Sequence, residues 1–167
     1  MLRRRNPPAE PDPVPAVQDD IYEVLRTQAL GLEPEPVPRA TDHDLPNVFG
    51  VVMDIGYPEG TATLVALADG TTSLYTSTGG GTIGAGSHAQ VATATHTLLR
   101  TAEATLDAFP PSQDSQLPPA EHTAITLLTY SGRRRSEAAT DDLGHNRSPA
   151  SRVFHAAHEV IHHLNQV

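Results

Sequence analysis

The residues best suited to catalysis lie close to the end of the chain. Residues 158–162 read HEVIH, which matches the helical pattern H-E-x-x-H, in which two histidines hold zinc and the glutamate is the general base of a metalloprotease. A catalytic zinc takes three protein ligands, and His155 lies one helical turn before His158. The pattern predicts a solvated polar face, an adventitious Zn²⁺ or Ni²⁺ site at His155, His158 and His162, or a functional zinc centre with Glu159 as base.

The second candidate is a glycine-rich stretch, STGGGTIGAGS at residues 77–87. Glycines leave backbone N–H groups uncovered and permit positive φ angles, and such a loop directly before a helix gathers N–H groups around an anion. Hydroxyl groups add further donors. The stretch therefore predicts a ligand-binding loop for a phosphate, nucleotide or carboxylate, made of Ser77, Thr78, Gly79, Gly80, Gly81, Thr82, Gly84, Gly86 and Ser87.

Other features of this loop favour a different role. Residues 79–84 match G-x-G-x-x-G, but the strands expected before them form a meander and not the βαβ unit of a dinucleotide fold. No G-x-x-x-x-G-K-[ST] pattern occurs, and the chain contains no lysine. The alternatives are that the glycines let the chain cross closely over the sheet edge, or that the loop contacts a partner protein.

Two isolated side chains also bear on chemistry. Asp54 lies inside an apolar run, which predicts a buried carboxylate that the adjoining turn satisfies. His88 is expected in the first turn of a helix, where it faces solvent or assists an anion. No serine lies in a G-x-S-x-G pattern, so a hydrolase triad has no anchor.

Three strands are expected to deliver the glycine loop. Val48–Ile55 is nearly continuously apolar, Thr61–Leu67 is rich in threonine and valine, and Thr71–Thr76 follows. Gly56-Tyr57-Pro58-Glu59-Gly60 and Asp69-Gly70 are strong turn sequences between them. The pattern predicts an antiparallel three-stranded meander.

The second half of the chain adds helices and a hairpin. Ser87 and Gln90 fit a capping box, which predicts a helix with Ser87 as N-cap that lasts to about Ala108. Two further strands are expected, and a loop at 141–147 follows them. Ser148-Pro149 then opens a last helix. Its predicted buried face consists of Val153, Ala157, Val160, Leu164 and Val167. The expected strands are His122–Tyr130 and Arg133–Ala139, the latter an edge strand whose three arginines oppose aggregation.

The fold class that follows is α+β. We expect a five-stranded, mostly antiparallel sheet, in the order three-strand meander, helix, hairpin and helix, flanked by two or three helices. Residues 1–16 are expected to be a disordered proline-rich tail, 17–31 a helix, 32–47 an acidic proline-rich linker, and 48–167 a single domain. In the first helix, four residues recur at helical spacing and form a stripe, apolar except for its last member, that would dock on the domain or on a partner: Ile21, Val24, Leu25 and Gln28.

Residues 53–75 and the glycine loop also carry a resemblance. Their signature, GYPxGxATLVAL…DGTxSLY…STGGGxIGxG, resembles a family of uncharacterised bacterial proteins, over roughly residues 48–167, which implies a discrete domain and no activity. The element order is loosely similar to the roadblock-type, profilin-like adaptor domains, which dimerise and bind GTPases. Those domains place two strands before the middle helix and three after it, so the likeness is an analogy.

Composition excludes several classes of function. The net charge of −9 over 167 residues opposes general binding to nucleic acid or to an anionic membrane. The chain has no cysteine, no apolar run long enough for a membrane span, and Asn6-Pro7-Pro8 where a signal peptide would be apolar. We therefore expect a cytoplasmic protein without a cofactor. The leading prediction is a non-enzymatic, adaptor-like module that binds another protein or a second copy as a homodimer; the alternatives are a zinc-dependent hydrolase and a small-anion or nucleotide binder.

Overall fold

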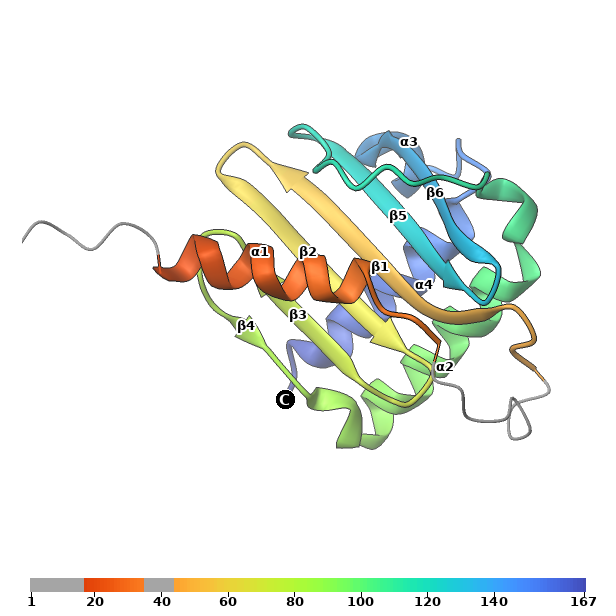
Figure 1. Ribbon diagram of the computed structural model, residues 1–167, viewed down its shortest axis with the longest axis horizontal. Coiled ribbons are helices and arrows are strands. Elements are labelled where there is room, and N and C mark those ends of the chain that lie inside the picture. The colour runs from red at the N-terminus through yellow and green to blue at the C-terminus, as the bar shows by residue number, and fades with distance from the viewer. Residues whose placement is uncertain (1–16, 35–43) are drawn as a thin grey trace, which may run out of the picture.

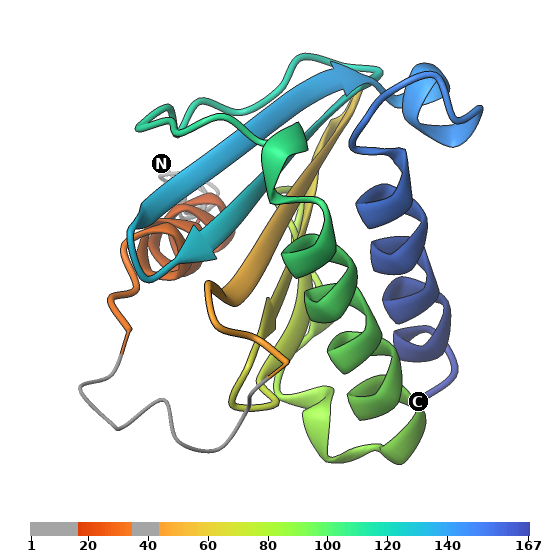
Figure 2. The same cartoon turned by 90° about the vertical axis from the view of Figure 1, so that its right-hand side faces the viewer.

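The protein consists of three layers. A computed structural model describes residues 17–34 and 44–167, so the expected disordered tail, 1–16, and part of the expected linker, 35–43, lie outside the described residues. One helix covers one face of a six-stranded antiparallel sheet and two long helices cover the other (Figures 1 and 2). The elements are α1 (Val17–Leu30), β1 (Val48–Tyr57), β2 (Gly60–Leu67), β3 (Thr72–Thr76), β4 (Gly81–Thr82), η1 (Ala85–Ser87), α2 (Ala89–Ala104), η2 (Leu106–Ala108), β5 (His122–Thr129), β6 (Gly132–Ala139), α3 (Thr140–Gly144) and α4 (Ser151–Leu164).

The α+β class and the antiparallel sheet are as predicted, with the meander β1–β2–β3 and the hairpin β5–β6. The strand order is β4-β3-β2-β1-β5-β6, so β1 is central and pairs with both β2 and β5. Successive side chains of β1 point to opposite faces. Val51 and Met53 face α2 and α4, on the side that we call the inner face, while Val52 and Asp54 face α1, on the outer face.

The prediction of five strands was one short. The sixth, β4, has two residues: Gly81 pairs with Tyr75 and Thr82 pairs with Leu74 of β3. Gly79 and Gly80, with φ angles of 98° and 93°, turn the chain back onto β3. A two-residue strand carries no periodic pattern, so nothing in the sequence indicated it. The predicted loop at 141–147 likewise contains a short helix, α3.

The predicted N-cap of α2 was wrong. Ser87 is the last residue of the 3₁₀ turn η1, and His88, in an extended conformation with φ −76° and ψ 126°, is the N-cap without a side-chain cap hydrogen bond. The left-handed conformation of Gly84 starts η1 and delays the helix by one residue. At its other end α2 stops at Ala104, and η2 occupies the last expected turn.

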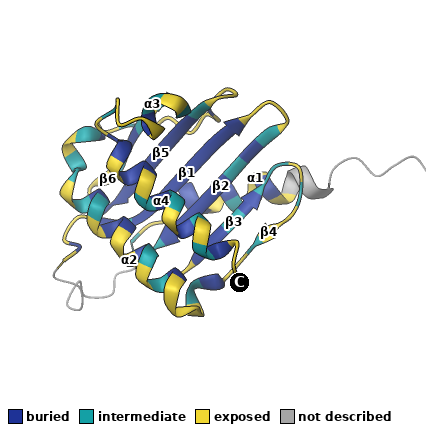
Figure 3. Cartoon of the chain, turned by 180° about the vertical axis from the view of Figure 1, so that it is seen from behind, coloured by how far each residue is buried: buried dark blue, intermediate teal, exposed yellow. Residues whose placement is uncertain are grey.

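The larger core lies between the inner face and the two long helices. Figure 3 shows α2 and α4 with buried residues toward the sheet and exposed residues away from it. Four of the five residues predicted for the buried face of α4 are fully or almost fully buried, and Val167, beyond the helix end, is 55% exposed. The side chains at the centre of this core include Val91, Leu98, Leu99, Ala102, Phe109, Val153, Ala157, Val160 and Leu164.

β6 is an edge strand, as predicted, and its three arginines bind the loop that follows Phe109. Arg134 points to the inner side and donates to the carbonyl oxygen of Phe109 at 2.9 Å. Arg135 is 6% exposed and donates to the carbonyl oxygen of Gln116 at 2.7 Å and to Glu137 at 3.2 Å. The segment after Phe109 also pairs with β6 through Pro111 and Arg134. These arginines therefore fasten the segment after Phe109 to the edge of the sheet, and their protection against aggregation stays a prediction. None of the described helices has the length and apolar character needed to cross a membrane.

Candidate functional site

The most polar buried cluster lies where α1 meets the outer face. Asp54 of β1 is fully buried. Arg26 of α1 donates two hydrogen bonds to it, from Nε to Oδ1 and from Nη2 to Oδ2, each of 3.0 Å. A carboxylate buried without such a partner is strongly destabilising. Two parallel bonds also fix the orientation of both groups. This pair therefore determines where α1 lies and which of its faces is turned to the sheet.

Two hydroxyl groups extend the cluster. Thr63 of β2 donates to Oδ1 of Asp54 at 2.7 Å, and the hydroxyl of Tyr22 lies 2.7 Å from the same threonine oxygen. Because the threonine proton is used toward Asp54, the tyrosine is the donor in its own bond. Asp54 thus accepts three hydrogen bonds, which satisfy it without the adjoining turn that the sequence predicted would do so.

Around this polar cluster, apolar side chains of α1 pack against apolar side chains of the sheet. We call the sheet side of this contact the outer-sheet site, defined by Val52, Asp54, Thr63, Val65, Tyr75 and Leu128. Tyr22, Ala29 and Leu30 of α1 are buried against it. The rings of Tyr22 and Tyr75 meet edge to face with centroids 5.6 Å apart, and burial raises the pKa of both tyrosines. Both phenols therefore stay neutral over the physiological pH range.

Two buried hydroxyls on this face have no hydrogen-bond partner among the described residues. They belong to Tyr75 and Thr126. Buried hydroxyls are normally paired, because leaving one unpaired costs free energy. On the outer face, the polar groups around Asp54 are therefore hydrogen-bonded, whereas the hydroxyls of Tyr75 and Thr126 are buried without a partner among the described residues.

α1 packs on the sheet through a different face from the one that the sequence predicted. Ile21 and Val24 of the predicted apolar stripe are 52% and 53% exposed, Leu25 is half-buried and Gln28 is exposed. The buried face instead carries Tyr22 and Arg26. Sequence reasoning missed Arg26 because a single arginine in a helix normally points to water. The available signal was the isolated Asp54, which needed a cation from elsewhere in the chain.

Hydrogen bonds join the glycine loop to residues of the neighbouring strands. Ser77 Oγ accepts a hydrogen bond from the Thr61 N–H at 2.9 Å, and Thr76 donates to the Gly79 carbonyl oxygen at 2.8 Å. The Gly84 N–H donates to Ser73 Oγ at 3.2 Å. The nine residues of the predicted ligand-binding loop lie within the single segment 77–87. The hydrogen bond to Ser77 fastens this segment to β2.

Close approach explains two of these glycines. A methyl group on Gly81 would meet the backbone of Leu74 and Tyr75 in β3. A methyl group on Gly86 would collide with the backbone carbonyl of Gly70, in the turn between β2 and β3. Gly80 and Gly84, by contrast, have open space around them and positive φ angles of 93° and 73°, so they serve the turns. Ile83 between them is 67% exposed.

The predicted metal ligands do not converge. His155 Nε2 lies 3.0 Å from the amide oxygen of Asn146, and His162 Nε2 lies 3.0 Å from the amide nitrogen of Gln166. The ring of His158 packs on Phe154 with centroids 4.3 Å apart. In the described ranges, 17–34 and 44–167, no group of three or more histidine, cysteine, aspartate or glutamate residues could hold a metal ion. His155, His158 and His162 are thus on one helix without forming a ligand set.

His158 has an unusual environment. Its Nε2 is buried without a partner among the described residues. Burial, and secondarily the neighbouring His155, lower the pKa of His158 below its usual value. The imidazole is therefore held neutral against Phe154 and acts as a packing group of α4.

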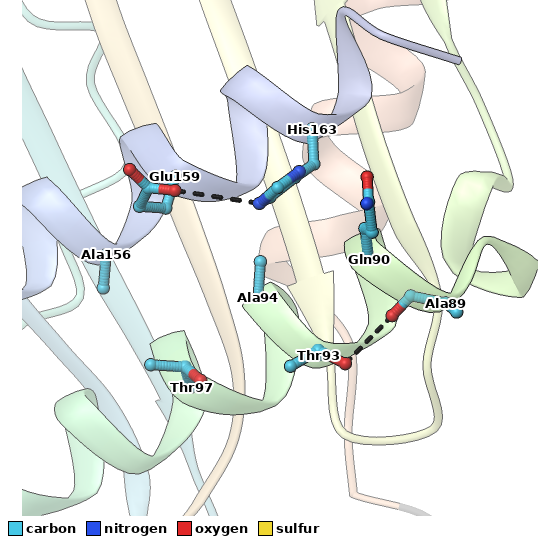
Figure 4. A pocket seen from close by; sticks show the side chains of 8 residues that line it. All are labelled: Ala89, Gln90, Thr93, Ala94, Thr97, Ala156, Glu159 and His163. Carbon is cyan, nitrogen blue, oxygen red and sulfur yellow. Dashed lines mark hydrogen bonds and ion pairs between the residues drawn. The ribbon is translucent and has the colours of Figure 1, made fainter.

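An open groove runs between α2 and α4. It has a volume of about 390 Å³ and is lined by Ala89, Gln90, Thr93, Ala94, Thr97, Ala156, Glu159 and His163 (Figure 4). Glu159, the base of the predicted zinc centre, has its Oε2 3.7 Å from Nε2 of His163 at this groove. The remaining lining consists of small side chains and Gln90.

The chain was compared with family models, with curated proteins and with solved structures, and none of the three comparisons found a match. The resemblance of residues 48–167 to an uncharacterised bacterial family therefore stays a prediction.

Proposed function

We propose that this protein is a non-enzymatic interaction module and that α1 is the element it presents to its partner. The observation that carries the proposal is the orientation of α1. Its polar face, with Arg26, is bound to the sheet, and this leaves Ile21 and Val24 about half exposed on the outside. Exposed apolar side chains in register on one helix face are the usual means by which a helix binds another protein.

The placement of the ionisable groups also favours binding over catalysis. Asp54 and Arg26 are buried and bonded to each other under α1, where a substrate has no access. Tyr22 and Thr63 complete the same closed network. These groups, which would be the natural catalytic candidates, are used to position a helix.

The partner class follows from charge. A chain with a net charge of −9 and no lysine is poorly suited to nucleic acid or to an anionic membrane, so the proposed partner is another protein or a second copy. We also place the module in the cytoplasm, because a chain without cysteine suits a reducing compartment.

A photo-crosslinking experiment tests the proposal. A benzophenone amino acid is introduced into the full chain at Val24, and the matched control carries it at Arg152, an exposed position on α4 in the opposite layer. In cells that express the protein naturally, we expect a discrete crosslinked product from Val24 and none from Arg152. Substitution Ile21→Glu should abolish that product. Equal labelling from both positions, or none from Val24, would contradict the proposal.

The two alternative functions have their own tests. A zinc-dependent hydrolase predicts turnover that a chelator removes and that Glu159→Gln abolishes. A small-anion binder predicts that phosphate or a nucleotide raises the melting temperature and that Gly80→Ala reduces this shift. Either result would replace the interaction module as the proposed function.

A further inference from the structure

We propose that a pocket lined by aromatic rings, at the end of α1, binds an acidic proline-rich segment, residues 10–15, of a second copy of this chain. Two copies are thereby joined through a short peptide on one and a pocket on the other. This contact lies outside the exposed stripe of Ile21 and Val24, so it and the proposed function are tested separately.

The pocket lies where the chain leaving α1 passes the turn between β5 and β6, and it has a volume of about 310 Å³. We call it the aromatic pocket, defined by Phe49, Leu128, Tyr130 and Arg133. The two rings are half-buried, with centroids 5.5 Å apart. Leu128, which also belongs to the outer-sheet site, pairs with Arg133 across the hairpin. The pocket therefore combines an apolar surface with one cation.

This combination selects the chemistry of the occupant. Grooves lined by aromatic rings bind proline-rich segments, whose polyproline II conformation is preformed and loses little entropy on binding. Nη2 of Arg133 donates to the carbonyl oxygen of Gln113 at 2.9 Å. No carboxylate of residues 17–34 and 44–167 forms an ion pair with Arg133. Because a guanidinium group binds carboxylates strongly, the aromatic pocket is complementary to prolines that alternate with acidic residues.

The chain contains a segment of this kind twice. Residues 10–15 read EPDPVP and residues 33–38 read EPEPVP, so the two hexapeptides differ only by aspartate in place of glutamate at the third position. The first two residues of the second hexapeptide, Glu33 and Pro34, line the aromatic pocket. The structure thus places one Glu-Pro pair beside these rings, and the open volume of the pocket lies next to it. Residues 10–15 carry the same chemistry.

The length of α1 decides which copy supplies this segment. α1 has 14 residues and is about 21 Å long, and the aromatic pocket begins beyond its last turn, at Leu32. Figure 1 shows the first turn of α1 on the β3–β4 side of the sheet and the last turn over β1. Pro13 lies four residues before Val17 and reaches at most about 14 Å from it. Residues 13–15 therefore cannot enter the pocket of their own chain, and the occupant comes from a second copy.

Intermolecular photo-crosslinking tests this contact directly. A benzophenone amino acid replaces Val14 in the full-length chain, and isotopically heavy and light chains are mixed before irradiation. We expect dimers of mixed mass in which residue 14 is joined to residues 128–133. The matched control carries the benzophenone at Arg152, an exposed position on α4, and should give no product at the pocket. Crosslinks within one chain only, crosslinks to another surface of the second copy, or no dimeric product would overturn the proposal.

Peptide binding tests the role of the cation. The probe is a fluorescent peptide of residues 9–16, titrated with the full-length chain and measured by fluorescence anisotropy. Arg133→Glu places like charges together and should weaken binding at least about tenfold. Arg152→Glu makes the same change on the opposite layer and should leave the affinity unchanged. Equal affinities for the wild type and Arg133→Glu would contradict the assignment of the pocket.

Variant peptides keep the proposal testable if Arg133→Glu does not fold, because they use the wild-type chain. The change Glu10→Gln/Asp12→Asn removes both charges and should weaken binding about tenfold. The change Pro11→Ala/Pro13→Ala/Pro15→Ala removes the preformed conformation and should abolish measurable binding. A wild-type peptide that does not bind, or variant peptides that bind equally well, would overturn the proposal. Such a result leaves the crosslink from Val24 as the separate test of the proposed function.

Discussion

The inner and outer faces of the sheet are covered by different chemistry. The inner face meets α2 and α4 through aliphatic side chains and Phe109, which are almost completely buried. The outer face meets α1 through a buried ion pair, two tyrosines and a few aliphatic groups, and two hydroxyls there have no hydrogen-bond partner among the described residues. Apolar burial supplies stability in proportion to area, whereas a buried ion pair supplies position. We infer that the inner face holds the domain together and the outer face determines the placement of one helix.

The largest effect is expected in the inner core. Phe109→Ala removes the largest fully buried side chain and should cost about 3–5 kcal/mol of unfolding free energy, measured by urea denaturation. The matched control is Phe49→Ala, whose half-buried ring packs on the outer cluster and should cost clearly less. Equal losses would show that the two faces contribute alike.

The next effect separates placement from stability. Arg26→Ala leaves Asp54 buried and unpaired, a change that costs about 3–5 kcal/mol where the structure cannot adapt. Here α1 can leave the sheet and let water reach Asp54, so the loss of global stability should stay below that range. Hydrogen exchange should show unprotected amides in α1 and unchanged protection in β5.

Arg152→Ala, at an exposed arginine of α4, is the control for Arg26→Ala and should change neither quantity. Replacing both partners, Arg26→Met with Asp54→Leu, should restore the protection of α1. Loss of protection throughout the sheet in Arg26→Ala would instead mean that the outer contact supports the whole domain.

A smaller effect is expected in the glycine loop, which contributes only Ala85 of the described core residues. Gly86→Ala should destabilise by about 1–3 kcal/mol, because the new methyl group meets the backbone of Gly70. Gly144→Ala is the matched control: it has open space around it at the end of α3 and should stabilise by about 0.4–1 kcal/mol. Thermal unfolding measures both, and a neutral Gly86→Ala would show that the close approach can relax.

The smallest effect is the pH dependence from His158. Its pKa is lower in the folded protein than in the unfolded chain, so the unfolded state binds more protons as the pH falls below about 6.5. Stability should therefore decrease on acidification through that range, and the decrease should be weaker in His158→Gln. His88→Gln, at an exposed histidine outside α4, is the control, and an unchanged pH profile in His158→Gln would contradict the assignment.

Much of the fold could be predicted from local pattern. The turn sequences at 56–60 and 69–70 produce the meander, and the helical spacing of Val153, Ala157, Val160 and Leu164 identifies the buried face of α4. These signals work because strand and helix periods are local properties of the chain. Prediction failed where two local structures compete within a few residues, as in the 3₁₀ turn that displaces the N-cap from Ser87 to His88.

Local sequence patterns were enough to predict the α+β class, the antiparallel hairpins, and a helix ahead of the sheet. The buried face of that helix depends on contacts between elements far apart in the sequence. Arg26 and Asp54 are 28 residues apart, and no periodicity links a helix residue to a strand residue at that distance. A buried carboxylate must find a cation, and this requirement outweighed the apolar stripe of Ile21 and Val24 in orienting α1.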